Sequence, residues 1–103
     1  YASVVDVFTA LADPTRRALL DQLQRDGHCT VSELVAANSV SQPAISRHLR
    51  VLRERNLVET EREGSAIRYA LADLRIIHAL DIMRSILATQ LANSVEIAQT
   101  IME

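Results

Sequence analysis

The residues of this sequence that could do chemistry are concentrated in one short polar and cationic stretch. Between Ser41 and Arg55 four arginines stand against one carboxylate, so this stretch carries a net charge of +3. The whole chain has 103 residues and a formal charge of −2, which leaves the remainder acidic. A guanidinium group can neutralise a phosphate or pair with a guanine edge, and a carboxamide can pair with adenine. The pattern therefore indicates contact with nucleic acid.

The spacing of apolar residues predicts that this stretch is one amphipathic helix. Ser41 can cap its N-terminus, and Pro43 is tolerated in a first helical turn. Ile45, Leu49 and Leu52 recur at helical spacing and form the stripe that we expect to be buried. The outward face then contains Gln42, Ala44, Ser46, Arg47, His48, Arg50 and Arg53.

Three helical segments are predicted before this helix. Apolar residues repeat from Val4 to Ala12, after which Asp13-Pro14 begins a second helix that stops at Gly27. Thr30 and Glu33 have the spacing of a capping box, which begins a short third helix that ends near Asn38-Ser39. The second helix is expected to bury Ala18, Leu19, Leu20 and Leu23 and to expose Arg16, Arg17, Gln22 and Arg25.

After the cationic helix the spacing of the apolar residues changes from that of a helix to that of a strand. From Leu57 to Leu71 the alternation of two predicts a β-hairpin with its turn at Glu63-Gly64-Ser65. From about Asp73 a long helical pattern follows. The predicted fold is mainly α with a small β-hairpin (α+β), in the order α-α-α-α-β-β-α. This is a winged helix-turn-helix, which places one helix in the major groove of DNA and the hairpin against the flanking backbone.

Three blocks of the sequence occur together in a specific order. They are ALADPTRR at 10–17, SQPAISRHLRVLR at 41–53, and Leu57-Val58 followed by RYAL at 68–71. In these blocks the chain resembles the ArsR/SmtB family of bacterial repressors, over roughly residues 7–87. The resemblance implies a homodimeric transcriptional repressor that binds an inverted-repeat DNA operator through the fourth helix and the wing. It also implies one winged helix-turn-helix domain over 1–103, with 1–12 and 74–103 as dimerisation helices.

Site residues follow from this assignment. Base and phosphate contacts are expected from the fourth helix, and wing contacts only from Arg62 or Arg68, because glutamates surround the tip of the hairpin. The expected DNA-binding residues are Ser41, Gln42, Ser46, Arg47, His48, Arg50, Arg53, Arg62 and Arg68. The expected dimer interface consists of Val4, Val5, Phe8, Leu80, Met83, Leu87, Leu91 and Val95, because the final helix is longer than a core of this size can cover.

The sequence departs from the family at both of its known metal sites. Thr30 and Ser32 stand where metal-sensing members have a Cys-x-Cys pair. Of the Asp, His, His and Glu ligands on the last helix only Asp73 is kept, the others being replaced by Arg75, Ile86 and Thr89. We therefore expect no metal site and no cofactor.

Several alternatives stay open. Cys29 is either a packing residue or a possible redox sensor, and His78 with Asp81 is either a surface pair or half of a metal site between two chains. The inducer, if one exists, is an unknown small molecule or oxidant. The alternative function is a winged-helix module that binds a partner protein. No catalytic constellation is found, and the lack of a bilayer-spanning apolar run favours a cytoplasmic protein without membrane contact.

Overall fold

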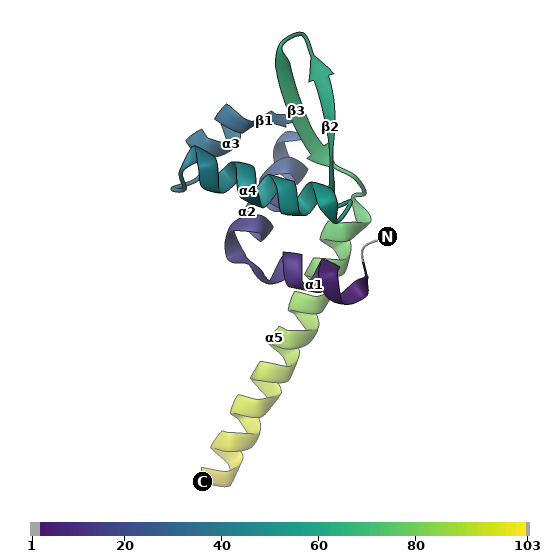
Figure 1. Cartoon of the computed structure of the whole chain (residues 1–103). Helices are drawn as coiled ribbons and strands as arrows, with labels where there is room; N and C mark the ends of the chain where they lie inside the picture. The colour runs from purple at the N-terminus through teal and green to yellow at the C-terminus, as the bar shows by residue number, and fades with distance from the viewer. Residues whose placement is uncertain (1–2, 103) are drawn as a thin grey trace.

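The computed structural model describes residues 3–102 and shows a small head of helices and strands from which one long helix extends (Figure 1). The molecule measures 65 × 31 × 21 Å because this last helix runs far beyond the head. The elements are α1 (Val4–Ala12), α2 (Pro14–Asp26), β1 (Cys29–Thr30), α3 (Val31–Ala37), α4 (Gln42–Glu54), β2 (Val58–Glu63), β3 (Ala66–Leu71) and α5 (Arg75–Met102).

Local hydrogen bonds set the helix boundaries that the sequence predicts. Asp13 caps α2 by accepting from the backbone N–H of Arg16 at 2.9 Å, and Ser41 caps α4 in the same way through Ala44. The capping box at the start of α3 is present. Gly27 ends α2 with a φ of 82°, a conformation that costs a residue without Cβ little. The caps fix where α4 begins, and therefore which side chains stand in its first turns.

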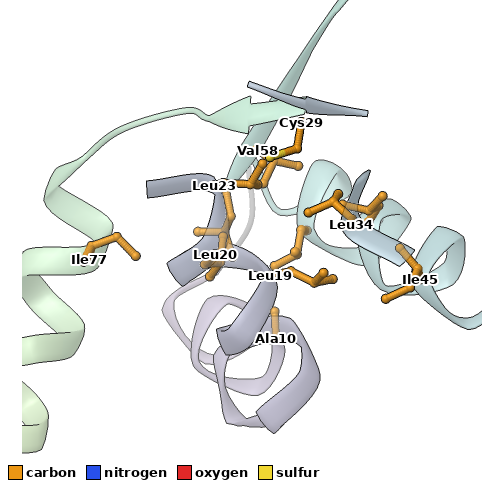
Figure 2. Close-up of a cluster of buried hydrophobic side chains, with 12 residues drawn as sticks. Ala10, Leu19, Leu20, Leu23, Cys29, Leu34, Ile45, Val58 and Ile77 are labelled. Carbon is orange, nitrogen blue, oxygen red and sulfur yellow. The ribbon is translucent and has the colours of Figure 1, made fainter. Parts of the chain in front are cut away.

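The apolar core packs against the inner side of α4. The predicted stripe of Ile45, Leu49 and Leu52 is fully buried, which confirms the orientation of this helix. Each buried leucine or isoleucine contributes about 1.5–3 kcal/mol through the removal of its side chain from water. Figure 2 shows buried side chains that other elements contribute to the same cluster. They include Leu19, Leu20, Leu23, Cys29, Leu34, Val58 and Ile77.

The sheet has one strand more than the sequence predicts. Cys29 and Thr30 form β1, which pairs antiparallel with Tyr69 and Arg68 of β3, so that the strand order is β1-β3-β2. A strand of two residues carries no alternating pattern and is formed only by its distant partner, which is why the sequence did not reveal it. The hairpin itself is confirmed, and Gly64 supplies the positive φ of 62° at its turn.

Two side chains of α2 lie on the other side from the one expected, and Arg16 and Arg17, which were expected to be exposed, are half-buried. Ala18 is exposed, and Gln22, which was expected outside, is buried with 5% of its surface exposed. The Oε1 atom of Gln22 accepts a hydrogen bond of 3.0 Å from Nδ2 of Asn38, the C-cap residue of α3, which satisfies the buried amide. Gln22 and Asn38 thereby join α2 to the turn that precedes α4.

Replacing Asn38 with alanine is expected to lower the free energy of unfolding by about 1–3 kcal/mol, because Oε1 of Gln22 then stays buried without a donor. The double variant Gln22→Met with Asn38→Ala should recover most of the loss, since neither polar partner remains. Urea unfolding at one fixed protein concentration measures both. A double variant no more stable than Asn38→Ala would contradict the role of this hydrogen bond.

Candidate nucleic-acid interface

The outer face of α4 is a surface of uncompensated positive charge. Arg47, Arg50 and Arg53 are exposed, and within residues 3–102 no ion pair involves any of them. Gln42 and Ser46 are exposed on the first two turns of the same helix. Guanidinium groups without a carboxylate partner keep their donors free for phosphate oxygens or base edges.

Two other predicted contact residues of this helix are already engaged. The hydroxyl of Ser41 accepts from the backbone of Ala44, so this side chain caps α4 while remaining exposed. His48 is half-buried, with 22% of its side chain exposed, and its Nδ1 atom lies 3.3 Å from Nη1 of Arg16. The structure therefore places His48 against α2, at the edge of the cationic face and not at its centre.

The wing is acidic, and its two arginines differ. Nε of Arg68 lies 2.9 Å from Oε2 of Glu63, and its Nη1 atom lies 3.8 Å from Oε1 of Glu33. Arg62 is exposed, and in the described part of the chain it has no such carboxylate partner. Of the two predicted wing contacts, Arg62 is the one whose charge is available.

A second exposed surface is apolar and combines α1 with α5. We call it the α1–α5 face; on α1 it includes Phe8, which is 55% exposed. Beside Phe8 lies a groove of about 320 Å³ whose walls are almost entirely apolar. Large contiguous apolar surfaces of this kind mark interaction sites. The face consists of Val4, Val5, Phe8, Ile82, Met83, Ile86, Leu87, Leu91 and Val95.

One predicted interface residue, Leu80, is less exposed than the others. Leu80 is partly buried and packs against the core of the same chain, so it belongs to the base of the α1–α5 face. Although α5 is long, no helix in the described residues is apolar enough over its length to cross a membrane.

Cys29 has the surroundings of a packing residue. Its side chain is fully buried, and burial raises the pKa of the thiol, with the carboxylates of Asp26 and Glu33 acting in the same direction. A protonated, inaccessible thiol is a poor nucleophile and a poor metal ligand.

The residues at the two family metal positions do not fit a metal. Arg75 donates to Asp73 through Nη2 at 2.7 Å, and these hydrogen bonds lower the pKa of Asp73 to about 2. The one retained carboxylate is thus occupied by the cation that replaces a ligand. Within residues 3–102 no three His, Cys, Asp or Glu side chains gather closely enough to hold a metal ion.

A helix-turn-helix whose second helix is exposed and cationic, followed directly by a β-hairpin, defines a winged helix-turn-helix domain. The family model described as "Bacterial regulatory protein, arsR family" matches residues 13–60. A transcriptional repressor SmtB homolog from Synechocystis is 41% identical over 73% of this chain. The chain belongs to the ArsR family of bacterial regulatory proteins, and the match spans 56% of the Synechocystis protein's length.

Solved structures agree with this assignment. The crystal structure of Rv0081 from Mycobacterium tuberculosis superposes with a TM-score of 0.76 at 31% identity, covering 85% of this chain and 88% of that one. A homodimeric winged helix-turn-helix DNA-binding domain from Mycobacterium bovis, a possible ArsR-family regulator, gives 0.73 at 27% identity and covers 82% and 78%. The predicted fold class and family are confirmed.

Proposed function

We propose that this chain is a sequence-specific DNA-binding transcriptional repressor that acts as a homodimer on an inverted-repeat operator. The proposal rests on the exposed face of α4, where Arg47, Arg50 and Arg53 form no ion pair with any residue of 3–102, on an otherwise acidic chain. Local positive charge on an acidic body directs phosphate binding to this one face.

The face divides into two parts by its place along α4. Gln42, Ser46 and Arg47 stand on the N-terminal turns, which enter the major groove in helix-turn-helix domains, so they read bases. Arg50 and Arg53 lie further along the helix and contact phosphates, and Arg62 adds a phosphate contact from the wing.

The homodimer is supported by the α1–α5 face. About half of the surface of Phe8 and Leu87 is exposed, which is unusual for large apolar residues gathered in one patch. A two-fold axis through this face uses the same patch on both chains and places two α4 helices on one palindrome. The similar domain from Mycobacterium bovis, described as homodimeric, supports a dimer.

Binding to DNA is tested by fluorescence anisotropy with the promoter of the protein's own operon against random DNA of equal length. We expect the promoter fragment to bind at least about a thousandfold more tightly, as specific repressors do. Equal affinity for both DNAs, together with a tight protein partner, would favour the alternative of a winged-helix interaction module.

Alanine at Arg50 or Arg53 is expected to weaken binding to operator and random DNA by the same factor. In the homodimer each variant loses one phosphate contact per subunit, two in all, so the magnitude of the slope of log affinity against log salt should fall by about 1.8. Titrations at several salt concentrations measure the slope. Arg25→Ala, an exposed arginine on α2 outside this face, is the control and should leave the slope unchanged. A loss confined to operator DNA would mean that these residues read bases.

Zinc, cadmium and arsenite are expected not to release the protein from its operator, because Thr30, Ser32 and the Asp73–Arg75 pair cannot hold them. Anisotropy of the preformed complex with micromolar metal measures release, and Cys29→Ser should behave as the wild type does. Release by zinc or arsenite in the wild type would contradict the expectation. Release by peroxide that Cys29→Ser abolishes would make Cys29 a sensor.

A further inference from the structure

The side chain of Arg16 joins three helices at one corner of the head. Its Nε atom donates to the carbonyl of Ala10 at 2.6 Å, and Nη2 donates to that of Thr9 at 3.3 Å. Both carbonyls lie in the last turn of α1, where they have no partner within the helix. Arg16, in the first turn of α2, thus completes the C-terminus of α1 and contributes a favourable charge to its dipole. The remaining nitrogen, Nη1, points to His48 of α4.

The contact with Arg16 determines the tautomer of the His48 ring. A guanidinium group has donors only, so Nδ1 of His48, 3.3 Å from Nη1 of Arg16, must be the acceptor. The proton of the neutral ring is then on Nε2. The carboxylate of Asp13 lies 3.9 Å from the same Nδ1 atom and is held in place by the backbone N–H of Arg16 at 2.9 Å.

We infer that His48 is a positioning residue whose Nδ1 bond to Arg16 fixes the DNA-reading helix relative to α1. This inference rests on the proposed function. Since α1 carries Phe8 of the α1–α5 face, the chain of contacts from α1 through Arg16 to His48 connects the dimer surface with the DNA surface. The arrangement of the two chains in the dimer then sets the angle at which α4 meets the groove.

Protonation of His48 removes this connection. A proton on Nδ1 abolishes the acceptor and places a second cation beside Arg16, while Asp13 is the one carboxylate within ion-pair distance of the ring in residues 3–102. From α1 the backbone carbonyls of Thr9 and Ala10 bind Arg16 at this corner. The ratio of operator affinity to random-DNA affinity should therefore be lower with a protonated His48 ring than with a neutral one.

Two substitutions separate positioning from direct DNA contact. In His48→Asn the side-chain oxygen is two bonds from Cβ, as Nδ1 is, so an acceptor for Arg16 is retained. In His48→Gln a donor is three bonds from Cβ, as Nε2 is, so a DNA contact is retained and the acceptor is misplaced. We expect His48→Asn to bind operator within about twofold of the wild type, and His48→Gln to bind about fivefold to tenfold more weakly. Glutamine is the better helix former, so helix propensity opposes this ranking.

The effect of pH on the affinity ratio distinguishes a positioning role of His48 from a role in stability alone, because a purely structural residue would not change this dependence. The fall of the affinity ratio at low pH should be absent in His48→Asn, and it should persist in His28→Asn and His78→Asn, the two exposed histidines elsewhere in the chain. If His48→Gln retains operator affinity and His48→Asn loses it, His48 contacts DNA directly. If both retain it, or both lose it equally, the positioning role is overturned.

A measurement without DNA keeps this inference distinct from the proposed function. Nitrogen-15 NMR of the histidine rings at neutral pH should show Nδ1 of His48 unprotonated and Nε2 protonated, and thermal melting should rank His48→Asn above His48→Gln. The opposite tautomer overturns the contact with Arg16 whether or not the protein binds DNA. If the wild type binds no operator but His48 has the expected tautomer, the proposed function is overturned and the contact between Arg16 and His48 stands.

Discussion

Glutamate in place of both Leu87 and Leu91 is expected to convert the protein to a monomer and to weaken operator binding by about a hundredfold or more. The side chains of Leu87 and Leu91 are 57% and 67% exposed in the single chain, so the head does not depend on them. Two charges per chain in a symmetric apolar contact prevent association, and each half-site must then be bound without the linked second one.

Sedimentation at micromolar concentration measures the mass, and anisotropy measures the affinity. Ala92→Glu is the matched control, because Ala92 lies on the same exposed stretch of α5 but about 100° or more around the helix from both leucines and about 60° or more from every other α5 residue of the α1–α5 face. It should remain a dimer with unchanged affinity. A double glutamate variant that still sediments as a dimer would show that the contact between chains is elsewhere.

Arg47→Ala is expected to weaken operator binding by about 1–3 kcal/mol and to leave binding to random DNA much less affected. Arg47 stands on the second turn of α4, has no ion-pair partner among residues 3–102, and lies in the place from which a side chain reaches base edges. Arg47→Lys keeps the charge and loses the planar pair of donors, so it should recover binding to random DNA but not preference for the operator.

Operator variants with single base substitutions, titrated against wild type and Arg47→Ala, identify the base involved. The affinity of Arg47→Ala should not change when one guanine that the wild type requires is substituted. An equal loss on operator and random DNA would assign Arg47 to a phosphate.

The features that the sequence predicts are those that neighbouring residues determine. Asp13, Thr30 and Ser41 each bond to a backbone N–H three residues on, so their caps could be recognised from spacing alone. The buried stripe of α4 follows equally from its period, and with it the exposed cationic face.

The features that the sequence did not reveal depend on residues far apart in the chain. Gln22 is buried because Asn38, sixteen residues on, supplies a donor, and polarity alone had placed it outside. The helical spacing places His48 on the polar face, but its ring contacts Arg16, which is thirty-two residues earlier in the chain. No local pattern carries either contact.

The acidic hairpin affects how strongly the protein binds to DNA other than its operator. Glu59, Glu61 and Glu63 occupy β2, so the wing approaches phosphates with several negative charges and Arg62 as its free cation in residues 3–102. We therefore expect contact with arbitrary DNA to rest mainly on the arginines of α4 and residence on each of the millions of competing sites to be short. We expect the lower affinity for arbitrary DNA to leave a larger share of the molecules available for the operator.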